Sequence, residues 1–213
     1  MGHEDDPMAG GDDMSVPTVA GDPASDFDKV TLPMPPQDGF TADDLDRIPD
    51  LPPHTELIDG SLVLVSPQKR FRMLMLKLLE QQMDSQVPPG LTVYREFTLR
   101  LGERQRPEPD LMLARDQETD GPDDTWVGPE PVLLAVEIVS PESHLRDHER
   151  KPELYARAGI PHFWLVEQEE YGAAVHVYEL DRLSGRYAPA GVHRDRVKVA
   201  APGHLDIDLT RTR

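Results

Sequence analysis

The chain of 213 residues contains no cysteine, which excludes disulfide bonds, thiolate metal sites and a cysteine nucleophile. This absence fits a reducing compartment. The N-terminus has neither the basic start nor the apolar middle of a secretion signal. No segment approaches the roughly 18 to 20 apolar residues of a membrane span. We therefore expect a cytoplasmic protein without a membrane partner.

Basic and aromatic residues are also scarce. There are 22 Lys and Arg against 40 Asp and Glu, a formal net charge of -18, so the protein as a whole repels nucleic acid at long range. An anionic substrate must therefore meet a local basic patch. Aromatic residues make up 6% of the chain, a poor supply for the sugar cleft of a glycosidase, which we rank last among the enzyme classes considered.

The length predicts one domain with a tail. Residues 1–40 hold nine acidic residues, one lysine and six prolines, a composition typical of disorder. We expect a solubilising tail there, and an acidic guard over a basic cleft is the alternative. Residues 41–213 should form the domain, which is long enough for one hydrophobic core.

Hydrophobic periodicity predicts a mixed α/β sheet flanked by helices. A short helix should begin at Thr41, and an Asp59-Gly60 turn should join two strands. Longer helices are expected over 68–86 and 144–158, with Pro152 kinking the second or starting a new one. The remaining strands are expected at 91–101, 110–114, 132–139, 162–166 and 174–180.

The 91–101 segment alternates apolar and polar residues, as a half-buried strand does. One side of this strand should carry Leu91, Val93, Phe97, Leu99 and Leu101, interrupted by Arg95. The runs 110–114 and 132–139 are almost wholly apolar, which is typical of central strands covered on both faces.

Three acidic residues lie in these apolar strands, where a charge needs a partner or a metal. Glu137 interrupts the 132–139 run and should point with Ala135, Asp110 opens the 110–114 run, and Glu56 starts the hairpin. If the strands are neighbours, their carboxylates form a hard oxygen site suited to Mg²⁺ or Mn²⁺. Lys151 lies one strand-to-helix connection after Glu137, where its ammonium group could meet developing negative charge.

Each of these residues also has a structural explanation. Glu56 alone is as well explained by an ion pair with Arg95 or Arg100, and Asp110 by a turn after proline. Glu137 is the hardest to explain without a functional partner.

Five separated motifs together resemble the Uma2 (DUF820) family of endonucleases in the PD-(D/E)xK nuclease superfamily. They are residues 56–60, Pro109-Asp110, 137–141, Lys151 and 155–166. The resemblance covers about residues 41–180. It implies a restriction-endonuclease-like fold and Mg²⁺- or Mn²⁺-dependent hydrolysis of DNA, by a chain that pairs as a homodimer.

The resemblance implies Asp110, Glu137 and Glu56 at the metal and Lys151 as the catalytic lysine. The superfamily usually places this lysine two residues after the acid, where this chain has Val139. The expected phosphate contacts are Lys69, Arg70, Arg72, Arg95, Arg146 and Arg150. The alternative is a catalytically inactive nucleic-acid- or protein-binding module that retains the fold.

Two further features have open interpretations. His144 and His148 have the four-residue spacing of helical zinc ligands, but the glutamate that follows the first histidine in metalloproteases is absent. We interpret them as helix-surface histidines. Trp126 is interpreted as a packing residue, with base stacking as the alternative.

Overall fold

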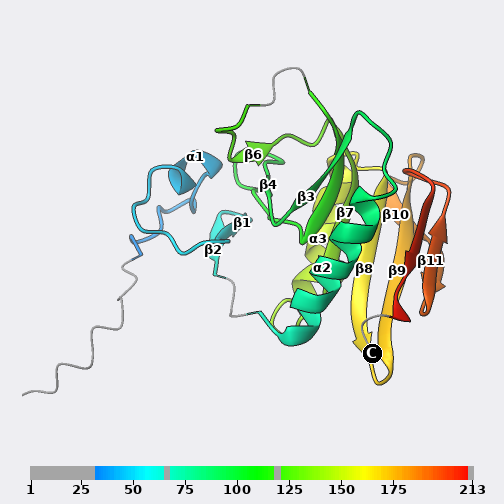
Figure 1. Cartoon of the computed structure of the whole chain (residues 1–213). Coiled ribbons are helices and arrows are strands. Elements are labelled where there is room, and N and C mark those ends of the chain that lie inside the picture. Colours follow the sequence, from blue (N-terminus) through cyan, green and yellow to red (C-terminus); the bar gives the residue numbers. More distant parts are fainter. Residues whose placement is uncertain (1–31, 65–67, 118–120, 211–213) are drawn as a thin grey trace, which may run out of the picture. The chain divides into compact units, whose positions relative to one another are not determined.

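The computed structural model describes residues 32–64, 68–117 and 121–210 (Figure 1). The chain divides into two units, residues 1–31 and 32–213, and everything described below belongs to the second. Most of the expected acidic tail therefore lies outside the described residues. Within the part that is described, Phe40 packs against Ala42 and Leu57.

The centre of the domain is a six-stranded mixed sheet in the order β10-β9-β8-β7-β5-β3. β7 and β8 pair in parallel, and their other neighbours pair antiparallel. A parallel pair needs a crossover connection, which here contains the segment 146–157. The mixed α/β class is thus confirmed. The bounds are β3 (Leu91–Arg95), β5 (Leu111–Arg115), β7 (Val132–Ile138), β8 (His162–Glu169), β9 (Gly172–Asp181) and β10 (Arg186–His193).

Helices and small strands cover both faces of this sheet (Figure 1). One face packs on α2 (Arg70–Asp84) and on the hairpin of β11 (Arg196–Val199) and β12 (Leu205–Asp208), with Val136 in its core. The other face packs on α3 (Lys151–Arg157) and has Ala135 in its core. Because successive strand residues alternate faces, Glu137 lies on the α3 side with Ala135, as expected.

Short elements precede the sheet. These are α1 (Ala42–Leu45), β1 (Glu56–Ile58) and β2 (Ser61–Val63). The amide and hydroxyl of Thr41 each donate to the Asp44 carboxylate at 2.8 Å, which confirms the expected start of the first helix. Asp59 and Gly60 have φ values of 54° and 77°, as a type I′ hairpin turn requires.

The prediction of one continuous strand over 91–101 was wrong. Glu96 has a φ of 46°, a conformation that breaks the extended backbone. β3 therefore ends before it, and β4 (Thr98–Leu99) pairs instead with β6 (Trp126–Val127). Val93 packs on the α2 face, whereas Phe97 packs on the α3 face.

The predicted helix 144–158 has two parts. A π-helix, η1 (Arg146–Arg150), leads directly into α3, whose first turn contains Pro152. Proline has no backbone amide to donate, so it lies where the hydrogen-bond pattern changes from that of η1 to that of α3. Pro152 thus starts a new helix, one of the two outcomes expected.

In the described ranges no helix is both long and apolar enough to cross a bilayer.

Candidate active site

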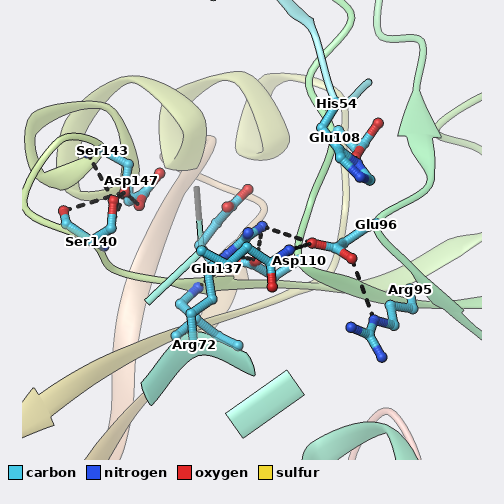
Figure 2. Close-up of polar contacts among 12 residues, drawn as sticks. His54, Arg72, Arg95, Glu96, Glu108, Asp110, Glu137, Ser140, Ser143 and Asp147 are labelled. Carbon is cyan, nitrogen blue, oxygen red and sulfur yellow. Dashed lines mark hydrogen bonds and ion pairs between the residues drawn. The ribbon is translucent and has the colours of Figure 1, made fainter. Parts of the chain in front are cut away.

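The pairing of β5 with β7 brings two carboxylates together. Leu111 pairs with Val136, so Asp110, one residue earlier, lies beside Glu137, one residue later. The Ile138 amide donates to the Asp110 carboxylate at 2.5 Å. Asp110 is 3% exposed and Glu137 2% exposed. The two acids thus share one buried point, as Figure 2 shows.

Lys151 joins Glu137 to Glu56. Its Nζ lies 2.9 Å from Glu137 Oε2 and 2.9 Å from Glu56 Oε1. Glu56 Oε1 also accepts a hydrogen bond of 2.8 Å from the Glu108 amide. The three acids and the lysine singled out in the sequence therefore lie together, although up to 95 residues separate them along the chain (151 minus 56).

The structural partners considered for Glu56 bind other residues. Arg95 pairs with Glu80 and with Glu96, and Arg100 pairs with Asp43.

Asp147 is a fourth buried acid, which the sequence analysis did not assign to the site. It lies in η1 and is 1% exposed. Its Oδ2 accepts from the Ser143 hydroxyl. Its Oδ1 has no hydrogen-bond partner and lies 3.8 Å from Lys151 Nζ. The spacing of Ser143, Asp147 and Lys151, four residues apart on one helix face, is the signal that would have identified it.

Two neighbouring side chains hold the carboxylates. Arg72, one of the expected phosphate contacts, binds Asp110, with Nε at 2.6 Å and Nη2 at 2.5 Å from Oδ1 (Figure 2). Its Nη2 also lies 3.2 Å from Glu96 Oε1. The Tyr155 hydroxyl donates to Glu137 Oε1 at 2.6 Å. Asp110 is therefore held by Arg72 as well as by the Ile138 amide, and Glu137 by Tyr155 as well as by Lys151.

The site holds more acids than cations. Burial raises the pKa of Asp110 from 3.8 to about 6, although Arg72 opposes the shift. Burial likewise raises the pKa of Glu137 well above 4.5 and that of Asp147 above 3.8. Burial by itself would lower the pKa of Lys151, but Glu137 and Glu56 outweigh it and raise this pKa well above 10.5. A further cation would stabilise the charged carboxylates.

These side chains line a small hollow of about 70 Å³, which is room for an ion with a few water molecules. Three of the expected phosphate contacts, Lys69, Arg72 and Arg146, line it as well. The other three lie outside its lining. Arg70 is exposed at the start of α2, Arg95 is paired as described above, and Arg150 binds Asp59 and Glu153.

The fold has a counterpart among solved structures. A crystal structure from Anabaena variabilis, described as "a putative nuclease belonging to DUF820", matches with a TM-score of 0.59 and 19% sequence identity. The match covers 81% of this chain and 98% of the other. At this identity the likeness establishes the fold.

The family is established by the sequence. Residues 42–211 match the model of the Uma2 family, described as "Putative restriction endonuclease". The chain therefore belongs to the Uma2 family. A search of curated proteins gave no match.

Proposed function

We propose that this protein is a metal-dependent endonuclease that hydrolyses phosphodiester bonds of DNA. The observation that carries the proposal is the meeting of Glu56, Asp110 and Glu137 around Lys151 in one buried hollow. A buried cluster of perturbed carboxyl groups in a hollow is typical of a functional site. Membership of the Uma2 family supports the same reaction class.

The donor set fits Mg²⁺ or Mn²⁺. Four buried carboxyl groups supply only oxygen donors, which hard cations prefer. Asp147 Oδ1 is buried without a hydrogen-bond partner, so the site has acceptor capacity that the protein leaves unused. Asp110 and Glu137 would hold the ion, with Glu56 beside it. When bound, such an ion lowers the pKa of its water and offsets negative charge on the phosphate.

The remaining roles fall to the chain's own side chains. Lys151 stays charged because its pKa is raised, so its ammonium can orient the attacking water or stabilise the negative charge of the transition state. Arg72 and Tyr155 keep the carboxylates of Asp110 and Glu137 in place. Lys69 and Arg146, at the same hollow, would contact the DNA backbone and offset the acidic charge of the whole chain. Pairing of two copies, each cutting one strand, belongs to the same proposal.

One observation favours an inactive binding module instead. Lys151 already pairs with both Glu56 and Glu137, so the hollow holds together without an ion. A module that had lost catalysis would have no need of Mg²⁺ at Asp110 and Glu137.

Cleavage of plasmid and single-stranded DNA tests the proposal, with Mg²⁺, Mn²⁺ and EDTA compared for the wild type and Glu137→Ala. We expect metal-dependent cutting by the wild type that the variant loses. If neither protein cuts, and Mg²⁺ does not raise the melting temperature of the wild type, the binding module replaces the nuclease.

A further inference from the structure

We propose a second metal site, for a divalent transition metal with Zn²⁺ as the preferred ion, formed by His144, His148 and Glu167. One ligand atom from each of these residues lies within 4.8 Å of the other two. His144 lies just before η1, His148 lies within η1, and Glu167 belongs to β8. The site uses none of the four acids of the catalytic hollow.

The tautomer of His148 supports a cation at this place. His148 Nδ1 lies 2.8 Å from the carbonyl oxygen of His144. A carbonyl only accepts, so Nδ1 carries the proton. The other ring nitrogen, Nε2, faces Glu167 Oε1 at 3.1 Å. Either a second ring proton or a metal ion must then lie between Nε2 and this carboxylate oxygen, and in a neutral ring a metal ion takes that place.

The surroundings of these groups match those of metal ligands. Metal-binding histidines usually donate their other ring N–H to a backbone carbonyl or a carboxylate, as His148 does to the carbonyl of His144. The acid is held too, because His176 Nε2 lies 2.9 Å from Glu167 Oε2. The side chain of His148 is 28% exposed and that of Glu167 31%, so ions in solution can reach them.

Little movement would complete the site. The rings of His144 and His148 stack with centroids 4.1 Å apart. Ligand atoms around tetrahedral Zn²⁺ lie about 3.4 Å apart, given bonds of about 2.1 Å. The three ligand atoms, now within 4.8 Å of one another, would therefore close by at most about 1.4 Å. Rotation of exposed or half-exposed side chains supplies such a shift.

Donor chemistry separates this site from the catalytic one. Imidazole nitrogen favours Zn²⁺ and its neighbours, whereas carboxylate oxygen alone favours Mg²⁺ and Mn²⁺. Two histidines and one glutamate leave a fourth coordination position for water. A surface hollow lined by His144, Glu167, Lys69 and Arg72 adjoins the cluster.

The ion would fasten η1 to β8. Asp147 precedes His148 directly, and Lys151 follows within one turn, so the segment that the metal holds also carries two residues of the catalytic hollow. The inference does not depend on nuclease activity, since binding can be measured without DNA.

The test is metal binding by the chelator-treated full-length protein. Co²⁺ reports through its visible absorption, which is intense when imidazole nitrogen binds in four-coordinate geometry, and Zn²⁺ displaces it in a calorimetric titration. We expect one such ion in the wild type. Affinity should fall at least about 100-fold in His148→Asn, Glu167→Gln and His144→Asn, and about 10- to 100-fold in His176→Asn.

Two controls make the result specific. His204 is exposed and outside the cluster, so His204→Asn should bind like the wild type, and Glu137→Ala should keep the Co²⁺ spectrum. His144 is exposed, so its variant should keep the far-ultraviolet circular dichroism of the folded protein. The proposal would be overturned if the Co²⁺ spectrum were unchanged in the variants of His144, His148 and Glu167, or if it were lost in Glu137→Ala alone. It would also be overturned if the wild type bound no ion, and the three residues would then form only an ion-pair cluster.

Discussion

Replacing Asp110 by Asn should change the stability of the metal-free protein by an amount that depends on pH. The pKa of Asp110 is 3.8 ordinarily and about 6 in the folded protein. The fold therefore prefers the protonated form. The charged form reduces stability progressively as the pH rises from about 4 to about 6, and by a constant amount above that range.

The magnitude follows from the shift. About two pKa units correspond to about 3 kcal/mol at 1.36 kcal/mol per unit. Asn is neutral and of the same size, and its one amide oxygen can accept from the Ile138 amide or from Arg72. The loss of the other hydrogen bond does not depend on pH, so it does not affect the change of the difference with pH. The free energy of unfolding of Asp110→Asn, minus that of the wild type, should thus rise by about 2 to 3 kcal/mol between pH 4 and pH 7.

Urea denaturation in EDTA measures this difference, followed by the fluorescence of the two tryptophans, of which Trp164 is fully buried. Asp116→Asn is the matched control for the substitution itself, because Asp116 is exposed just after β5. A difference for Asp110→Asn that stays flat, or falls as the pH rises, would refute the reasoning. Saturating Mg²⁺ should stabilise the wild type by about 2.7 kcal/mol at 100 times the Kd and the variant much less.

Three further predictions concern neighbouring side chains. Lys151→Met leaves Glu56 and Glu137 without their cation, so its free energy of unfolding in EDTA should fall by about 3 to 5 kcal/mol; a loss below 1 kcal/mol in urea denaturation would contradict the pairing. Tyr155→Phe removes a buried hydrogen bond to Glu137 and should reduce stability by about 1 to 3 kcal/mol while retaining more cleavage than Glu137→Ala, and equal loss of cleavage in the two variants would give Tyr155 a larger role. Lys69→Gln should lower the slope of log Kobs for DNA against log salt by about 0.9 in fluorescence anisotropy, whereas the control Arg194→Gln should not, and identical slopes would exclude Lys69 as a phosphate contact.

The acids of the site could be predicted because the apolar strands around them could be predicted. A carboxylate inside an apolar strand needs a partner, so the runs around Glu137 and Asp110 pointed to one site before their register was known. The pairing of β5 with β7, on which the shared site depended, was a condition of that prediction and was not fixed by the apolar runs. The Asp59-Gly60 turn was similarly local, since only a few residue types suit its positive φ values.

The features that were not predicted leave no mark in the apolar pattern of the sequence. The conformation of Glu96 has no signal in its own residue type, so the break after β3 was missed. Asp147 lies in a π-helix, whose extra residue per turn does not appear in an apolar pattern of period 3.6. Arg72 binds Asp110 across 38 residues, and charge alone could not distinguish this pairing from a phosphate contact.

A crystal structure of the full chain soaked in Mn²⁺, with anomalous scattering recorded at the manganese absorption edge, tests the central claim most directly. We predict anomalous density among Asp110, Glu137 and Glu56, lost in crystals of Glu137→Ala. Density confined to other places, or none at saturating Mn²⁺, would contradict the account of these carboxylates as a catalytic metal centre.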